Sequence, residues 1–339
     1  MAGTALSPLC LGFEKRLRID MAAYIVRRLL VALLVLFMVT LIVFFVIRLL
    51  PGDPLLIFVA QSQQSGSMSM KEVEHLRKEF GLDKPVMVQY AVWVTGILHG
   101  NLGTSIYYHE KVGTLMLERF PVTLYLGLTA FALSSILGIL LGLIAALRRG
   151  TWIDTLATTF ANIGVTIPVF WLGLLLIYAF GLKLGWLPIA GYTSPFENFW
   201  LSIKQAVMPV ICLSIVGLAM NARQMRSSVL EVAQQDYVRT AWSKGLRERV
   251  IVFRHMLKNS LIPVITLLGI GVGFVIAGSV LVETVFAIPG VGRLLVTSVF
   301  AQDYVVVQSG TLVIAVIIML SNLIVDITYG WLDPRIRYG

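Results

Sequence analysis

The sequence has little charge and few cysteines. Only 13% of its 339 residues are charged, whereas 58% are hydrophobic. A water-soluble domain of this length could not carry so much apolar surface without aggregating, so the composition indicates an integral membrane protein. Cys10 in the N-terminal tail and Cys212 inside an apolar run lie in different environments, and they predict neither a disulfide nor a metal site.

Catalytic groups are missing from the apolar runs. All four histidines fall outside these runs, and no His-Glu-x-x-His zinc motif occurs. No apolar run contains a serine together with a histidine, or a pair of acids, as an intramembrane protease would need. We therefore expect no catalytic residue and no enzymatic activity in this chain.

The sequence also lacks an energy source of its own. The phosphate-binding Gly-x-x-x-x-Gly-Lys-Ser/Thr loop is absent, since the dipeptide Gly-Lys occurs nowhere. The centres of the apolar runs carry none of the charged groups with which ion-coupled transporters bind their coupling ions. If this protein moves a solute uphill, the energy must come from another protein.

Six charge-free runs are long enough to cross the hydrocarbon core, which takes about 20 apolar residues. The predicted fold class is therefore an all-α integral membrane protein with six transmembrane helices. The predicted spans are Leu29–Ile47, Val122–Leu147, Thr155–Leu182, Gln205–Ala222, Asn259–Val282 and Tyr304–Val325.

The distribution of lysine and arginine sets the expected orientation. With a cytoplasmic N-terminus, the inner segments hold the entire formal surplus of +9, and the outer segments hold equal numbers of both signs. Because these basic residues lie beside the spans without interleaved aromatic residues, we expect a lipid bilayer and no nucleic acid as their partner. We expect both termini to be cytoplasmic.

These boundaries divide the chain into five parts. They are a cytoplasmic N-terminal segment at 1–28, a first transmembrane helix at 29–50, an extracytoplasmic segment at 51–121, a five-helix core at 122–330 with a cytoplasmic loop at 223–258, and a cytoplasmic tail at 331–339. The extracytoplasmic segment is too long for a plain loop. We expect it to form a cap of short helices, one of them at Met70–Phe80.

The cytoplasmic loop has the pattern of two short amphipathic helices that bend at Gly245. Before the glycine, apolar residues recur four apart at Ala233, Tyr237 and Ala241; after it, Leu246, Val250, Phe253 and Leu257 recur at helical spacing. Basic residues occupy the opposite faces. This pattern predicts two helices on the membrane surface that dock into another protein.

Polar and small residues inside the spans are candidates for a pathway. Pro168 predicts a kink in the third span, close to Asn162 and Thr166. The fifth span carries Gly269, Gly273 and Ser279, which allow close helix packing and sliding. Ordinary helix packing explains these residues nearly as well, so the pathway assignment of all five stays a prediction.

Taken together, the motifs resemble those of the permease subunits of ABC importers. Thr240-Ala-Trp-Ser-Lys-Gly245 followed by Leu257-Lys-Asn-Ser-Leu-Ile-Pro263 is similar to the coupling loop of that family, although Thr240 stands where the family name gives glutamate. The long spacing from Gly245 to Pro263 resembles the peptide and nickel branch. The B-type permease of dipeptide and oligopeptide importers has similar stretches at Tyr24–Arg28, Leu50–Pro54, Gly81–Pro85, Glu283–Gly290, Asp303–Tyr304 and Asp333–Arg337.

The resemblance implies a type I importer permease with cytoplasmic coupling helices, in a bacterial or archaeal plasma membrane. The implied partners are a second related permease, two ATP-binding subunits and an extracytoplasmic solute-binding protein. ATP and Mg would bind to the ATPases, and this chain would hold no cofactor and no metal. The implied ATPase-coupling residues are Asp236, Tyr237, Arg239, Thr240, Ala241, Lys244, Gly245 and Leu246.

Two other functions stay open at this stage. The same architecture imports nickel, opines, glutathione or oligosaccharides in related systems, so a di- or oligopeptide is the preferred substrate among several. A stand-alone channel or secondary transporter is the alternative from a different class, and the uncharged span centres argue against it.

Overall fold

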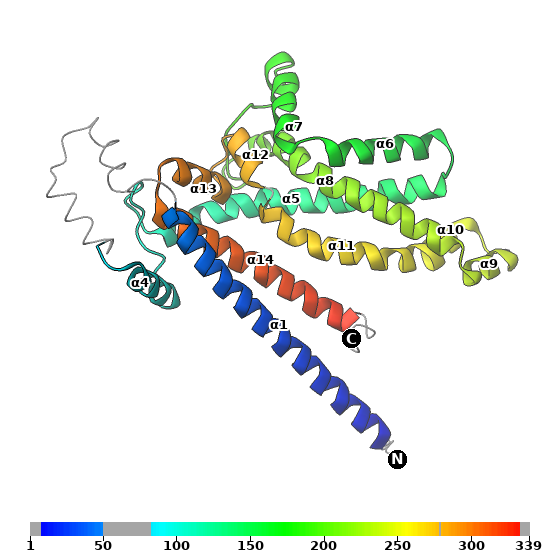
Figure 1. Ribbon diagram of the computed structural model, residues 1–339. Coiled ribbons are helices and arrows are strands. Elements are labelled where there is room, and N and C mark those ends of the chain that lie inside the picture. The colour runs from blue at the N-terminus through cyan, green and yellow to red at the C-terminus, as the bar shows by residue number, and fades with distance from the viewer. Residues whose placement is uncertain (1–7, 50–82, 278, 333–339) are drawn as a thin grey trace.

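The computed structural model describes residues 8–49, 83–277 and 279–332. Within these ranges every named secondary-structure element is a helix. The helices pack as a long bundle, with α9 and α10 at one end and α4 and α13 at the other (Figure 1). Their bounds are α1 Pro8–Leu49, α4 Val86–Leu98, α5 Val112–Leu147, α6 Trp152–Thr166, α7 Val169–Leu176, α8 Phe199–Ala233, α9 Asp236–Ser243, α10 Glu248–Val250, α11 Leu257–Ala277, α12 Ser279–Val285, α13 Val291–Phe300 and α14 Tyr304–Leu332. Two π-helical segments, η1 Ile177–Lys183 and η2 Ile251–Met256, follow α7 and α10.

Five helices are long and apolar enough to cross a membrane, and the number rises to six if a bent pair of helices is counted as one span. The five segments are Val26–Leu49, Val112–Leu147, Phe199–Ala233, Glu248–Gly269 and Tyr304–Leu323. The all-α, multi-span prediction is therefore confirmed. The helices extend beyond several predicted spans: α8 begins at Phe199 and runs without interruption to Ala233, past the predicted end at Ala222.

The third predicted span is not one straight helix. α6 and α7 meet at an angle of 106°, which is far larger than the proline kink that the sequence suggests. Ile167 has φ −69° and ψ 125°, the extended conformation that a following proline imposes on its neighbour. Because Pro168 also has extended backbone angles, the chain leaves the helix for two residues and α7 starts in a new direction (Figure 1).

The α5–α8 pair forms the centre of the bundle, and small residues bring the two helices close. A Cβ atom at Gly138 would lie 2.6 Å from Cβ of Asn221, and one at Gly142 would overlap the carbonyl oxygen of Ala222. These glycines are four residues apart and so face the same side of α5. Only glycine permits this separation between the two helices.

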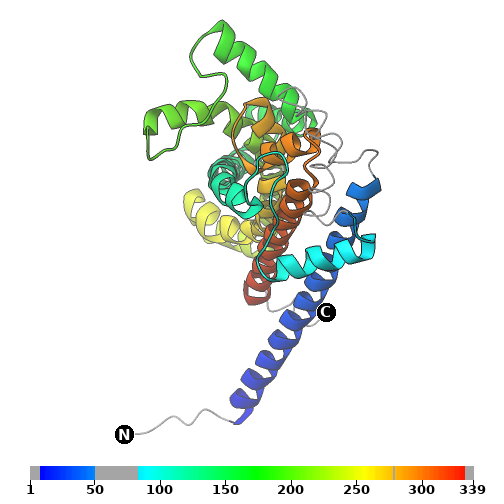
Figure 2. The same cartoon turned by 90° about the vertical axis from the view of Figure 1, so that its left-hand side faces the viewer.

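α4 packs across α1 (Figure 2). The side chain of Phe44 is fully buried between the rings of Tyr90 and Trp93, whose centroids lie 5.1 and 5.7 Å away. The Arg48 guanidinium donates to Oε1 of Gln89 at 2.7 Å. The predicted extracytoplasmic segment thus contributes a short helix that is held against the first span. The predicted helix Met70–Phe80 lies outside the described residues.

Candidate functional site

The predicted coupling loop folds as α9, a turn and α10, in the order that the sequence suggests. The amide of Gly245 donates to the carbonyl of Trp242 at 2.9 Å, and the amide of Leu246 donates to that of Ala241 at 3.4 Å. This pair of bonds is a Schellman motif, in which the residue after the C-cap takes the left-handed conformation. Gly245 has φ +69°, and a Cβ atom there would meet nothing within 4 Å, so its backbone conformation is what favours glycine.

One face of α9 is buried in the bundle. Val238 is fully buried and Ala241 is 4% exposed, and both belong to an apolar cluster with Met225 and Val229 of α8. Asn259 of α11 donates its Nδ2–H to the hydroxyl of Tyr237 at 2.8 Å. These contacts fix α9 to the ends of α8 and α11, so a force applied to α9 is transmitted directly to two membrane-crossing helices.

Several large apolar side chains of the loop are exposed. Tyr237, Trp242 and Phe253 are 42%, 51% and 63% exposed. We call these exposed apolar residues of the loop the α9 patch; they are Tyr237, Trp242, Leu246, Val250 and Phe253. Exposed and charged residues surround it, among them Asp236, Arg239 and Lys244, and Arg239 Nη1 lies 3.7 Å from Asp236 Oδ1.

The predicted apolar face after Gly245 is not the face that packs on the bundle. Leu246, Val250 and Phe253 are exposed, and of the predicted face only Leu257 packs, half-buried, on the bundle. The buried residues are Ile251, Val252 and Met256. The reason is that η2 is π-helical. In a π-helix, bonds join residues five apart, so Ile251 and Met256 share a face that a period of 3.6 does not reveal.

The predicted residues of the loop do not all act on one surface. Thr240 donates its hydroxyl to the carbonyl of Asp236 at 2.9 Å, which is a bond within α9. Ala241 is buried against the bundle, whereas Tyr237, Arg239, Lys244 and Leu246 are exposed. The loop therefore has buried residues that anchor it to the bundle and exposed residues that are available to a partner.

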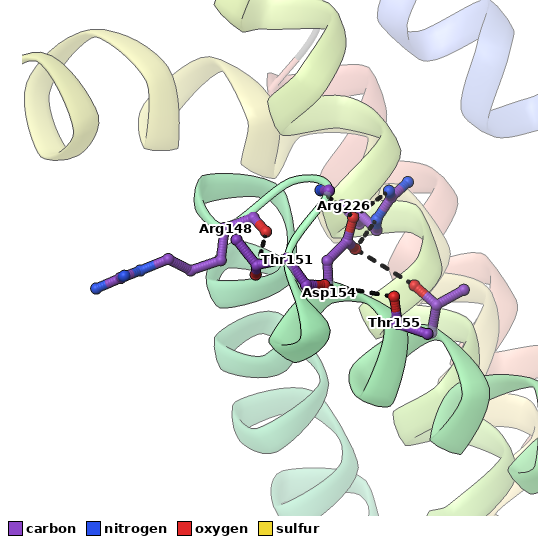
Figure 3. Close-up of polar contacts among 7 residues, drawn as sticks. Arg148, Thr151, Asp154, Thr155 and Arg226 are labelled. Carbon is purple, nitrogen blue, oxygen red and sulfur yellow. Dashed lines mark hydrogen bonds and ion pairs between the residues drawn. The ribbon is translucent and has the colours of Figure 1, made fainter.

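An ion pair that the sequence did not suggest, between a buried aspartate and a half-buried arginine, joins α6 to α8 near the α9 end. Arg226 Nε donates to Asp154 Oδ1 at 2.7 Å, and its Nη2 donates to Oδ2 at 2.8 Å. The Gly150 amide and the Thr158 hydroxyl also donate to this carboxylate. Figure 3 shows Arg226 reaching the carboxylate while the side chain of Arg148 points away. A two-pronged pair of this kind holds the first turn of α6 on α8.

A cavity of about 230 Å³ opens beside this pair, between α5, α6 and α8. Asn162, one of the predicted pathway residues, lines it together with Arg223 and Arg226. Arg223 Nη2 donates to Oδ1 of Asn162 at 3.3 Å. The predicted fourth span ends at Ala222, so the prediction placed these two arginines in the cytoplasmic loop. Because α8 continues, they lie on the same unbroken helix as the span itself.

The other predicted pathway residues lie elsewhere. Thr166 is exposed near the end of α6 and donates its hydroxyl back to Asn162 O at 3.2 Å. Gly269 and Gly273 belong to α11, which packs against α8, α14 and α5, whereas α6 packs against α8 and α5 from the other side (Figure 1). The structure thus brings Asn162 together with Arg223, and it does not place the α11 glycines beside them.

Ser279 belongs to a third location, a buried carboxylate at the end of the bundle opposite α9. Glu283 is fully buried, and its Oε1 accepts from the Thr123 hydroxyl at 2.7 Å. Its Oε2 accepts from the Arg293 amide at 3.0 Å in the first turn of α13, and Ser279 also donates to the carboxylate. The family resemblance singled out the stretch Glu283–Gly290 without giving Glu283 a role. In the structure, its carboxylate is a tie between α5, α12 and α13.

The carboxylate of Asp303 similarly organises the start of α14. It accepts from the Ser105 hydroxyl and from the Tyr107 amide, and its Oδ1 accepts from the Val306 amide at 3.2 Å. Within the part of the chain that the structure describes, no group of three or more His, Cys, Asp or Glu side chains is arranged to hold a metal ion.

Comparison with known proteins assigns this arrangement to a family. Residues 138–338 match the model for binding-protein-dependent transport system inner membrane components, and residues 21–127 match the N-terminal component model of the same systems. The chain belongs to this family of ABC importer permeases. The membership makes it a multi-pass protein of the inner membrane and a subunit of an ABC transporter.

Curated relatives agree along nearly the whole chain. A di/tripeptide transport system permease protein, DppB, from Pseudomonas aeruginosa is 40% identical over 94% of this chain and 99% of its own length. A dipeptide transport system permease protein, also DppB, from Alkalihalophilus pseudofirmus is 36% identical over 94% of this chain and all of its own length. The resemblance drawn from the motifs is thereby confirmed.

Proposed function

We propose that this permease carries di- or oligopeptides across the membrane, driven by ATP that separate ATPase subunits bind with Mg and hydrolyse. The related proteins named as peptide permeases support this substrate class. An extracytoplasmic solute-binding protein delivers the peptide, and a second, related permease completes the pathway. The loop at 223–258 and both termini face the cytoplasm, in agreement with the positive charge of the inner segments.

The observation that carries this proposal is the α9 patch. Large apolar side chains are exposed there, in a loop whose helix α9 is anchored to α8 and α11. Aromatic residues exposed on a rigid helix, with charged residues around them, are typical of the centre of a protein interface. An ATPase that holds this patch and changes its own shape would move the attached helices, provided that its contacts with the patch differ between its two states.

Reconstitution tests the proposal. The chain, its second permease, both ATPases and the binding protein are placed in proteoliposomes, and uptake of a labelled dipeptide is measured with and without ATP. ATP-dependent uptake that requires the binding protein is the expected result. Uptake of nickel or a sugar in place of peptide would refute the substrate class, and uptake by this chain alone would show a stand-alone transporter.

A further inference from the structure

The direction of the Arg223 side chain points to a ligand in the cavity between α5, α6 and α8. Arginine side chains in membrane helices ordinarily extend toward the nearest aqueous interface. Arg223 instead bonds to Asn162, which is eight residues beyond Asp154 on α6, or about 12 Å farther from the α9 end at 1.5 Å per residue. Arg223 and Asn162 are both exposed and both line the cavity, so these polar groups are accessible to a solute.

Arg223, Arg226 and Asp154 together carry a net positive charge beside the cavity. Arg226 occupies both oxygens of Asp154. In the described part of the chain, Arg223 has an amide oxygen as its hydrogen-bond partner and forms no ion pair with a carboxylate. This positive charge favours an anion, and the planar guanidinium best matches a carboxylate, which it can bind through two parallel hydrogen bonds.

The size and depth of the cavity favour the end of a small solute over a lipid headgroup. Its volume of about 230 Å³ accommodates a carboxylate and several waters, since one water occupies about 30 Å³. The basic pair Arg148 and Arg149 marks the α5–α6 turn as the expected cytoplasmic end of the span, where a phospholipid phosphate would lie, whereas Asn162 lies about three turns farther along α6. The amide of Asn162 can orient a carboxylate that Arg223 binds.

We propose that this cavity is a transient binding site for the carboxyl terminus of the translocated peptide, with Arg223 binding the carboxylate and Asn162 positioning it. The inference rests on the proposed function, since it names the part of the peptide that the permease recognises. It predicts that the permease itself distinguishes a free-acid peptide from the same peptide with an amidated C-terminus.

The test uses the reconstituted importer and two labelled dipeptides that differ only in a free or an amidated C-terminus. Each variant is compared with wild type for the same peptide, so that any preference of the binding protein cancels. Arg223→Gln is expected to lower uptake of the free acid about tenfold and to leave uptake of the amide within about twofold. Lys204→Gln removes an exposed positive charge from the same helix and is expected to change neither.

A second variant keeps the test decisive if Arg223→Gln does not assemble. Asn162 is exposed, so Asn162→Ala is expected to fold and to slow the free acid selectively, by about threefold. Equal slowing of both peptides would show a role in packing or gating and would overturn the inference. A change that follows the anionic lipid content and affects both peptides equally would show a lipid site and would also overturn it.

The two proposals fail in different ways. If wild-type protein shows no ATP-dependent uptake of either peptide, the proposed function is wrong. If wild-type protein takes up peptide and the variants show no difference between acid and amide, only the carboxylate site is wrong.

Discussion

The Glu283 carboxyl group packs so closely against the backbone of Gly290 that it leaves no room for a side chain at position 290. A Cβ atom at Gly290 would overlap the Glu283 carboxyl group, and one at Gly292 would lie 2.9 Å from Glu283 Oε2 and 2.5 Å from Cα of Val280. The carboxylate needs this closeness because it accepts from the Arg293 amide at the start of α13. A carboxylate at a helix N-terminus is favoured by the unpaired amides there.

The first prediction concerns this contact. Gly290→Ala should destabilise the protein by about 1–3 kcal/mol, the usual cost of adding atoms to a packed site. Thermal unfolding in detergent measures the change. Gly113→Ala is the matched control, because a Cβ atom there has its nearest neighbour at 4.0 Å. If both variants unfold at the same temperature, the overlap does not constrain the sequence.

The second prediction concerns the turn at Gly245. Gly245→Val should cost about 1–2 kcal/mol in the turn, because an L residue with a side chain is strained at a positive φ. We expect normal amounts of protein in the membrane and reduced uptake for each ATP hydrolysed. Gly245→Asn should be mild, since asparagine tolerates this conformation. Full loss of both variants from the membrane would indicate a role in folding alone.

The third prediction tests the α9 patch as the ATPase contact. Trp242→Ala and Phe253→Ala should each weaken association with the ATPase subunits at least tenfold, as truncation of a large apolar residue in an interface commonly does. The melting temperature of the permease alone should hardly change, because both side chains are more than half exposed. Phe196→Ala, at a fully exposed position outside the patch, is the control for lost apolar surface.

Charge reversal at Arg239 and Lys244 is the fourth prediction. Both residues are exposed and surround the patch, so Arg239→Glu combined with Lys244→Glu should slow the association with ATPases and reduce uptake. The effect should shrink as salt is raised, because exposed charges are screened. Undiminished ATP-dependent uptake at low salt would exclude these residues from coupling.

The fifth prediction concerns the pair of Asp154 and Arg226. Asp154→Asn and Arg226→Gln should each destabilise the protein, because each leaves a partner without its ion pair. The double variant should lose less than the two single variants together, with a coupling free energy of about 1 kcal/mol or more. The Arg226 side chain is 31% exposed, which keeps this figure below that of a fully buried pair. Strict additivity in thermal unfolding would show that the pair contributes nothing.

The sequence by itself determined the helical membrane class, the family and the position of the loop turn. These follow from local rules: uncharged runs of sufficient length, a glycine after a helix, and motifs in a fixed order. Gly245 is where the pattern places it, since its left-handed conformation depends only on the hydrogen bonds of α9.

The tertiary structure decided what depends on contacts between distant segments. Asp154 and Arg226 are 72 residues apart, and they pair only because α6 folds back on α8. The packed face of η2 also escaped prediction, because its π-helical turn alters the period from which faces are inferred. The partners of the Glu283 carboxylate are likewise distant in sequence or set by the fold, since Thr123, Ser279 and the start of α13 meet around it. A periodic pattern identifies which residues of a helix can share a face. Whether their side chains are buried or form pairs depends on which other helix packs against that face.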